Sequence, residues 1–148
     1  MLVYGHNGIA APGGNIVPNG WLVAWVSKRL GISDFGRCVT IGVMHHGDIV
    51  AVALYNKYLY PNIEITFVIA SPHWASPGAV RGILSYPFKQ LHCKRITATI
   101  EATNTKARAF VTRLGFKQEG YHPDVFDHGD AVTYGLLRSD ARRWMGNN

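Results

Sequence analysis

Two carboxylates, Glu64 and Glu101, stand within strand-like runs of a chain in which only 16% of the residues are charged. Glu64 interrupts the apolar run NIEITFVIA, and a charge there needs a reason because burying it costs free energy. Glu101 closes the run KRITATIE, and a carboxylate on a sheet surface is often only an exposed strand end. A carboxylate beside a cleft can take a proton from an ammonium group, directly or through water. Of the two carboxylates we favour Glu64, and we predict that Glu64 and Asn104 are the catalytic residues.

A second group of chemistry-bearing residues is the loop WASPGAVRG, which precedes a predicted helix. Gly78 permits a tight turn and Pro77 has no N–H, so the backbone N–H groups of Ser76–Arg81 are expected to point out of a helix N-terminus, which favours anions. Arg81 lies in the first helical turn, where the helix dipole disfavours a cation unless a phosphate is bound. An ordinary glycine loop with a solvated arginine is the alternative interpretation.

The third group lies in NTKARAFVTRLGFKQEG, residues 104–120. Asn104 can cap the helix by accepting backbone N–H bonds, or its amide can reach an amide of a ligand. Lys106, Arg108 and Arg113 are most often a solvated face, but together with Arg81 they could neutralise a phosphorylated ligand.

Other kinds of site are not indicated. His45 and His46 are adjacent on a predicted strand and point to opposite faces, and the remaining five of the seven histidines show no ligand spacing. The two cysteines, Cys38 and Cys93, form no CxxC pair and are predicted to be buried free thiols. GxSxG, Walker and GxGxxG motifs are absent from the sequence. We therefore predict no metal site.

The bulk properties predict one globular domain. The chain has 148 residues, 47% of them hydrophobic, and a net charge of +6, which favours anionic partners without choosing among them. The first residues do not form a secretory signal, and runs such as WLVAWV are too short to span a bilayer. We expect a soluble, cytoplasmic protein with no membrane association.

The elements that must position these residues follow the order β-α-β-β-β-α-β-α-β-β. Helices are predicted over residues 21–30, 80–91 and 104–114, the first capped by Asn19, and Pro87 should kink the second. Strands are predicted over 1–4, 38–46, 49–58, 62–70, 94–101, 116–121 and 131–138, with loops at 5–20 and 122–130 and a last short helix from Ser139. A strand–helix–strand unit implies a parallel pair and the hairpins are antiparallel, so the sheet should be mixed.

These elements and motifs resemble the GNAT N-acetyltransferases. The C-terminal part is similar to the branch typified by ribosomal-protein alanine acetyltransferases, and the match covers roughly residues 38–140. The resemblance rests on an N-x-x-A/S pattern, an LGF-x-x-EG pattern, an acidic-glycine turn and a Y-x-L-x-R pattern, here at Asn104 and Ala107, 114–120, 129–130 and 134–138.

The resemblance implies an α/β GNAT fold, a mixed central sheet flanked by helices on both faces, over a single domain of residues 1–148. It also implies acetyl-CoA as co-substrate and an acetyltransferase that acts on a primary amine, either a protein N-terminus or a small amine, by direct attack. In the family, one strand binds the pantetheine arm, a loop binds the pyrophosphate, and a helix start contacts the pantetheine and thiol. These correspond here to Val68 and Ile69, to Ser76, Pro77, Gly78, Ala79, Val80 and Arg81, and to Asn104 with Ala107, Phe110 and Arg113 on its helix.

Two positions depart from the family pattern. Its phosphate loop usually reads Q/R-x-x-G-x-G/A, whereas Ala75 and Val80 occupy the outer positions here. Many members also place a tyrosine four residues before the helix-ending glycine as the acid for the leaving thiolate, and that position is Val111. Water, the substrate or another group such as Tyr121 would then protonate the thiolate.

Two other functions stay open at this point. A non-enzymatic acyl-CoA-binding or sensor domain is suggested by Val111. A nucleic-acid-binding module is suggested by the positive charge, but the sequence lacks a recognisable motif for it, so we expect no nucleic-acid partner. The sequence also leaves a homodimer open.

Overall fold

The computed structural model describes residues 1–6, 15–32, 34–71, 74–127 and 129–145. Within these ranges the strands form a mixed eight-stranded sheet in the order β2-β1-β3-β4-β5-β6-β8-β7. The strands are β1 (Leu2–His6), β2 (Asn15–Pro18), β3 (Cys38–His45), β4 (Asp48–Leu59), β5 (Asn62–Ile69), β6 (Arg95–Glu101), β7 (Lys117–Phe126) and β8 (Gly129–Leu137). The helices are α1 (Asn19–Leu30), α2 (Pro77–Ser85), η2 (Tyr86–Gln90), α3 (Thr105–Leu114), η3 (Arg138–Ala141) and α4 (Arg142–Met145).

The chain divides into two compact units. The first contains Met1–Lys57 and Thr66–Ile83, and the second contains Tyr58–Ile65 and Leu84–Asn148. The division falls in the middle of β5, so one continuous strand contributes a half to each unit. The single domain expected over residues 1–148 stays a prediction.

The first unit carries a helix on each face of β4. Successive side chains of a strand point to opposite faces, so β4 can contact both helices. Val52 and Leu54 pack with α1 in a buried core cluster that also contains Val3, Leu22, Val26 and Cys38. The next residue, Tyr55, points the other way, and its hydroxyl donates a hydrogen bond to the Ile83 carbonyl of α2. The expected helices on both faces are therefore present in this unit.

Pro87 changes the type of helix. In an α-helix the Ile83 carbonyl would accept a bond from the N–H of residue 87, and proline has none. The chain accordingly leaves the α conformation after Ser85 and forms the π-helix η2, in which the Leu91 N–H bonds to the Tyr86 carbonyl. Pro87 thus coincides with a change from α-helix to π-helix, whereas the kink expected there stays a prediction.

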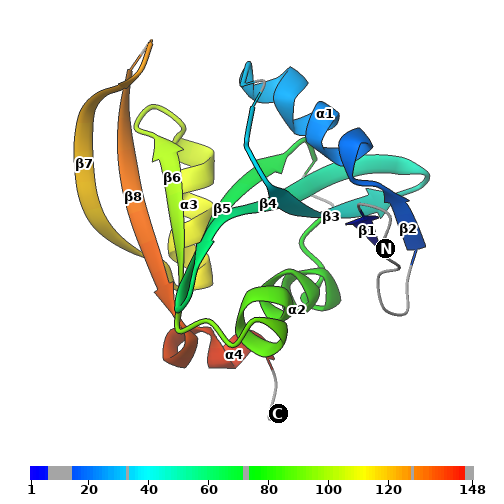
Figure 1. The fold of residues 1–148 in the computed structure, drawn as a ribbon. Coiled ribbons are helices and arrows are strands. Elements are labelled where there is room, and N and C mark those ends of the chain that lie inside the picture. The colour runs from blue at the N-terminus through cyan, green and yellow to red at the C-terminus, as the bar shows by residue number, and fades with distance from the viewer. Residues whose placement is uncertain (7–14, 33, 72–73, 128, 146–148) are drawn as a thin grey trace. The chain divides into compact units, whose positions relative to one another are not determined.

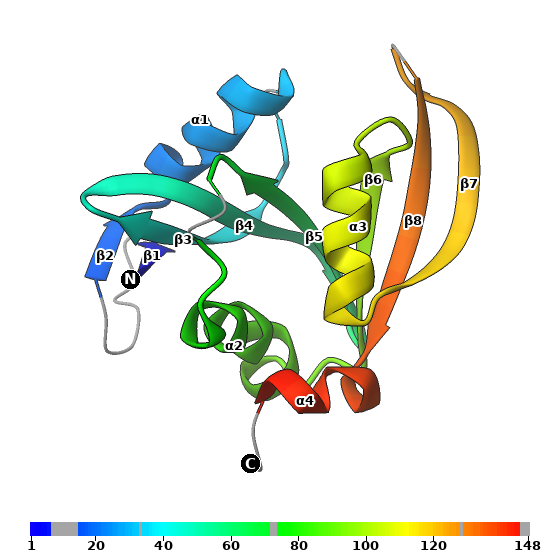
Figure 2. The same ribbon diagram turned by 180° about the vertical axis from the view of Figure 1, so that it is seen from behind.

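The second unit is a sheet covered on one face by α3. The first half of β5 pairs in parallel with β6, from Asn62↔Arg95 to Ile65↔Ala98, and β8 pairs antiparallel with both β6 and β7. Figures 1 and 2 show α3 lying along one face of β6 and β8. Val111 and Leu114 of α3 are buried, as are Ile96, Ala98, Val132, Tyr134 and Leu136 of the sheet.

Two expectations near the N-terminus are wrong. Residues 15–18 were expected in a loop, but they form β2, which pairs in parallel with β1. Asn19 was expected to cap α1, but Pro18 is the N-cap residue and Asn19 is buried. The Asn19 side chain instead donates to the Cys38 carbonyl oxygen at 3.3 Å and accepts from the Thr40 hydroxyl. These bonds to β3 use the side chain that a cap would need.

The expected loop at 122–130 is also wrong, because β7 runs to Phe126 and β8 begins at Gly129. The register shifts between His122 and Phe126, where Pro123 has no N–H for a ladder bond. The Asp130 carboxylate accepts the Asp124 N–H at 2.9 Å, so a side chain supplies an acceptor in this irregular part of the hairpin.

Candidate functional site

The residues expected at the pantetheine arm lie in the second half of β5. The parallel ladder with β6 ends at Ile65↔Ala98, while β5 continues to Ile69. Val68 packs against the core cluster of the first unit, and the next two residues, Ala70 and Ser71, both donate to the Val50 carbonyl. Val68 and Ile69 therefore occupy a strand segment beyond the β6 ladder, and their contact with pantetheine stays a prediction.

The start of α2 differs from the row of free N–H groups that we expected over Ser76–Arg81. The Ser76 side chain caps the helix by accepting the Ala79 N–H at 3.1 Å, and its carbonyl accepts the Val80 N–H. Ser76 itself donates to the Trp74 carbonyl, and Pro77 has no N–H to offer. Some of the N–H groups at this helix start are therefore bonded within the chain and are not available to an anion.

Gly78 faces open space at the start of α2. A Cβ atom built on Gly78 would meet no atom within 4 Å, so packing does not require glycine there. Ala79 and Val80 are buried, 5% exposed each, which directs both side chains into the core. The β-branched Val80 thus faces away from solvent, and only its backbone could contact a phosphate.

Asn104 is the N-cap of α3. Its side-chain oxygen accepts the Ala107 N–H at 3.1 Å, so the capping interpretation is confirmed. The amide nitrogen of the same side chain keeps its two donors, and the residue is exposed. Asn104 can therefore hold the helix start and still offer hydrogen bonds to a ligand amide.

The cationic residues of α3 do not act as one face. Arg108 is partly buried and donates from Nε to the Tyr134 hydroxyl and from Nη1 to the Ala102 carbonyl, both at 2.9 Å. Arg113 lies with its guanidinium carbon 6.0 Å from the centre of the Phe110 ring, in the last turn of the helix. Arg108 is thus bonded within the protein, whereas Ala107, Phe110 and Arg113 remain candidates for ligand contact.

Glu64 lies on a polar face of the second unit. It alternates with the buried Ile63 and Ile65, and it pairs in register with Thr97 of β6. The Thr97 hydroxyl donates to the Asn62 side-chain oxygen at 2.7 Å and accepts from Arg95 Nε at 3.3 Å. Alternation thus explains how an apolar strand carries this charge, and the catalytic role of Glu64 stays a prediction.

Val111 has no access to a ligand from its present position. It is 5% exposed and belongs to the buried side of α3. A tyrosine at this position would add a ring to a filled core, which destabilises proteins by typically about 1–3 kcal/mol. A core residue therefore occupies the position of the family tyrosine. The variant Val111→Tyr would change the packing of the core as well as add a proton donor.

Tyr121, the alternative proton donor, is already bonded to a carboxylate. Its hydroxyl donates to Asp130 Oδ2 at 2.5 Å on the exposed β7–β8 hairpin. This hydrogen bond raises the pKa of Tyr121 above its usual value, with smaller contributions from desolvation and the Asp130 charge. The bond from Tyr121, together with that from the Asp124 N–H, lowers the pKa of Asp130. Tyr121 is a weak acid in this setting.

Several residues of the family pattern have structural roles that the sequence did not reveal. Glu119 forms an ion pair with Arg95 that passes over Gly135, where a Cβ atom would collide with both side chains. Arg138 donates to the carbonyl oxygens of His92 and Cys93. In the sequence, Glu119, Gly135 and Arg138 are visible only as a glycine and two charged residues of the family pattern. Their partners are distant in the sequence, so these contacts could not be predicted.

The two cysteines are as predicted. Cys38 and Cys93 are buried free thiols, and burial raises the pKa of both. Among the described residues, no cluster of three or more histidine, cysteine, aspartate or glutamate side chains could hold a metal ion. Within the same ranges, no helix combines the length and apolar composition needed to cross a bilayer.

The comparison with known families identifies the chain. The family described as "Acetyltransferase (GNAT) domain" matches residues 20–117, so the chain belongs to the GNAT acetyltransferases, whose members transfer an acetyl group from acetyl-CoA to an amine. A Bacillus subtilis protein named "Putative ribosomal N-acetyltransferase YdaF" is 35% identical over 72 residues, which cover 46% of this chain and 38% of that protein. The matched segment thus spans well under half of this relative.

Solved structures show the same fold at low identity. A GNAT-family acetyltransferase from Bacillus anthracis is 22% identical with a TM-score of 0.56, covering 78% of this chain and 72% of its own. A chimera of the spermidine N-acetyltransferase SpeG from Vibrio cholerae and hSSAT is 18% identical with a TM-score of 0.60, covering 74% of this chain and 71% of its own. The expected GNAT fold is therefore confirmed.

Proposed function

We propose that the chain is an N-acetyltransferase that transfers the acetyl group of acetyl-CoA to a primary amine by direct attack. The observation that carries this proposal is the course of β5, which continues past the end of its β6 ladder at Ile65 within the region matched to the family. A strand edge released from its ladder can offer backbone N–H and C=O groups to the amides of a ligand. Val68 and Ile69 lie in this segment.

The remaining contacts to acetyl-CoA are assigned by the family pattern, and each is considered on its own element. The open space at Gly78 suits close approach of a pyrophosphate to the start of α2, where Arg81 adds a positive charge. Asn104 offers its amide nitrogen from the start of α3. The net charge of +6 favours a ligand that carries several phosphate charges.

The reaction needs one bond formed, one broken and one proton moved. The amine nitrogen attacks the thioester carbonyl carbon, a backbone N–H of Val68 or Ile69 stabilises the oxyanion, and the C–S bond then breaks. The nitrogen loses its proton to Glu64, directly or through water. The thiol has a reference pKa of about 8.5, so the thiolate leaves near neutral pH with little help. This accommodates the absence of a tyrosine at position 111.

The test is amine-dependent release of free thiol from acetyl-CoA. The panel should contain small polyamines, because one similar structure is a spermidine N-acetyltransferase, and peptides with free N-termini, because one relative is named for ribosomal acetylation. We expect thiol release and a singly acetylated product with one of these classes, and none without the amine. Absence of CoA binding would contradict the proposal.

A non-enzymatic acyl-CoA sensor is the second candidate, favoured by the buried Val111 and by the proton of Tyr121, which Asp130 already accepts. The same assay separates the two. Tight binding of acetyl-CoA without thiol release across the whole panel would replace the enzyme by the sensor.

A further inference from the structure

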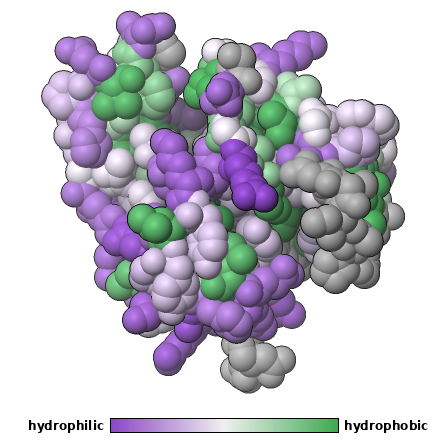
Figure 3. Space-filling view, viewed as in Figure 1, coloured by the Kyte–Doolittle hydropathy of each residue, from purple (hydrophilic) through white to green (hydrophobic). Residues whose placement is uncertain are grey.

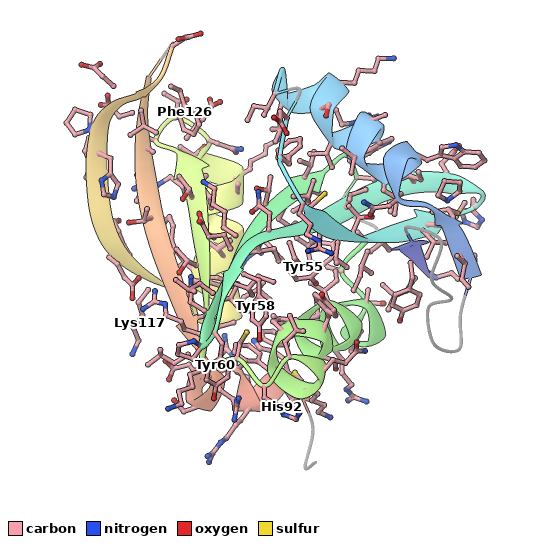
Figure 4. All side chains as sticks on the ribbon, in the orientation of Figure 1. Tyr55, Tyr58, Tyr60, His92, Lys117 and Phe126 are labelled. Atoms are coloured by element: carbon pink, nitrogen blue, oxygen red, sulfur yellow. The ribbon has the colours of Figure 1, made fainter. Side chains whose placement is uncertain are left out.

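A groove lies along one flank of α3, within the second unit. It has a volume of about 690 Å³, and its helix side is formed by Thr105, Arg108, Ala109 and Thr112. Lys117 and Gln118 at the start of β7 form the opposite side, and Figure 4 labels Lys117 at this end of the strand. Ala107 and Phe110, the helix residues assigned to acetyl-CoA, do not line this groove.

The charge of the groove lining is positive. Two of its residues are cationic, Arg108 and Lys117, and none of the lining residues is acidic. Lys117 Nζ lies 3.8 Å from Asp140 Oδ2, and the Lys117 side chain is 77% exposed. An ion pair this exposed adds little to the stability of the protein. Figure 3 shows a largely hydrophilic surface over β7 and β8, seen from the other side of the sheet.

Arg108 is the unusual member, because its charge has no carboxylate partner among the described residues. Its two acceptors, the Tyr134 hydroxyl and the Ala102 carbonyl, are neutral oxygens. A partly buried guanidinium is normally stabilised by an anion, since desolvation of a charge is costly. Its Nη2 group keeps donors that these two bonds do not use.

A second donor lies beside it. Tyr134 is 3% exposed, lines the groove, and accepts through its oxygen the bond from Arg108. Because the phenol oxygen acts there as an acceptor, its proton stays available to an anion. Phe116 and Ala109 add apolar surface to the same groove.

We propose that this groove binds a small molecule that carries a carboxylate or phosphate group on an apolar body. The anion is bound by the Arg108 guanidinium and the Tyr134 hydroxyl, with Lys117 on the opposite side. The apolar part lies against Phe116 and Ala109. The site is separate from the residues assigned to acetyl-CoA, and the proposal does not depend on acetyl transfer.

The experiment is an NMR titration of the ¹⁵N-labelled full chain without CoA, using benzoate as the carboxylate probe and inorganic phosphate as the phosphate probe. We expect saturable shifts of the Thr105, Thr112 and Gln118 amides with benzoate. Comparable shifts with phosphate would assign the site to phosphates as well. No saturable shift with either probe overturns the proposal.

Variants define the site. Arg108→Gln should weaken benzoate binding about tenfold or more, because charge-assisted hydrogen bonds are lost, and Lys117→Gln should weaken it less. Ala109→Leu fills the groove at an exposed helix position while keeping both charges, so it should abolish binding even if Arg108→Gln unfolds the chain. Arg142→Gln removes an exposed charge outside the groove and should leave the affinity unchanged. Unchanged affinity in Ala109→Leu would contradict the proposal.

A repeat of the titration in saturating CoA separates this groove from the coenzyme site. We expect the benzoate shifts to persist. Full displacement of benzoate by CoA would show that the groove belongs to the coenzyme site and would overturn the inference, while leaving the proposed acetyl transfer intact.

Discussion

The Tyr55 hydroxyl lies 2.5 Å from the carbonyl oxygen of Ile83 and supplies the donor that Pro87 cannot provide. Tyr55 is 1% exposed, so removing the hydroxyl leaves a buried carbonyl without this partner. Tyr55→Phe should therefore lower the free energy of unfolding by about 1–3 kcal/mol. Urea denaturation followed by circular dichroism measures this. Tyr60→Phe, at an exposed tyrosine, is the matched control, and equal losses in both variants would contradict the assignment.

Asn104 caps α3, and we propose that its amide nitrogen also contacts the ligand. Asn104→Ala removes the cap and should cost about 1 kcal/mol of stability, whereas Asn104→Asp keeps the accepting oxygen and should cost little. Both variants lose the amide donors, so both should bind acetyl-CoA more weakly if those donors contact the ligand. Thermal denaturation and calorimetric titration measure the two effects. Wild-type affinity in Asn104→Asp would remove the amide from the site.

Gly78 tests the proposed phosphate contact. Because a Cβ atom at this position would meet no atom within 4 Å, Gly78→Asp should fold normally. Its carboxylate would repel a pyrophosphate and weaken CoA binding by about tenfold or more. Gly78→Asn, which has the same size without the charge, is the control. Calorimetry that gives the same affinity for both variants and the wild type would place the pyrophosphate elsewhere.

Glu64 tests the proposed base. Glu64→Gln should lower the turnover rate by roughly 10²- to 10⁴-fold, the usual contribution of general base catalysis, with CoA affinity unchanged. Glu101→Gln changes the other strand carboxylate and should retain turnover. Steady-state kinetics over a range of pH provides the measurement. A Glu64→Gln variant as fast as wild type at every pH would exclude Glu64 from the mechanism.

The Tyr121–Asp130 bond predicts the pH response of the β7–β8 hairpin. The pKa of Asp130 is lowered, so its contribution to stability is complete above the usual aspartate value and is lost as the pH falls through the lowered pKa. The pKa of Tyr121 is raised, so its contribution is complete below the usual tyrosine value and is lost as the pH rises through the raised pKa. Asp130→Asn should return the Tyr121 pKa toward 10.0.

An NMR titration of ¹³C-labelled tyrosine measures the Tyr121 pKa directly. Glu119→Gln is the control, because this acid lies on the same strand but pairs with Arg95. The Tyr121 pKa should therefore fall in Asp130→Asn and stay unchanged in Glu119→Gln. An unaltered Tyr121 pKa in Asp130→Asn would show that the hydrogen bond does not persist in solution.

Features with local causes could be predicted from the sequence. The limits and spacing of α3 depend on residues of the helix itself. Asn104 caps its start, apolar residues repeat along it, and Gly115, with a φ of 108°, ends it. The turn between the strands predicted at 38–46 and 49–58 also follows from adjacent residues, with Gly47 at a φ of 82°. In such segments the neighbouring residues determine the backbone.

Features that depend on distant partners could not be predicted. Asparagine is a preferred N-cap residue, but Asn19 bonds to Cys38 and Thr40 of β3 instead. β2 is four residues long and is defined by its pairing with β1. In the candidate site, the end of the β5–β6 ladder and the bond from Tyr121 to Asp130 both depend on strand register, which one sequence does not specify.

Arg108 also has a mechanical consequence for the start of α3. One guanidinium ties the helix to β8 through Tyr134 and to the turn before Asn104 through Ala102. Rotation of α3 about its axis would stretch both bonds together, so the helix, the turn and the strand should move as one rigid body. Arg108 lies one helical turn after Asn104, and its N–H bonds to the Asn104 carbonyl at 3.1 Å. The orientation of Asn104 therefore depends on contacts that α3 makes with β8 and with the turn before it.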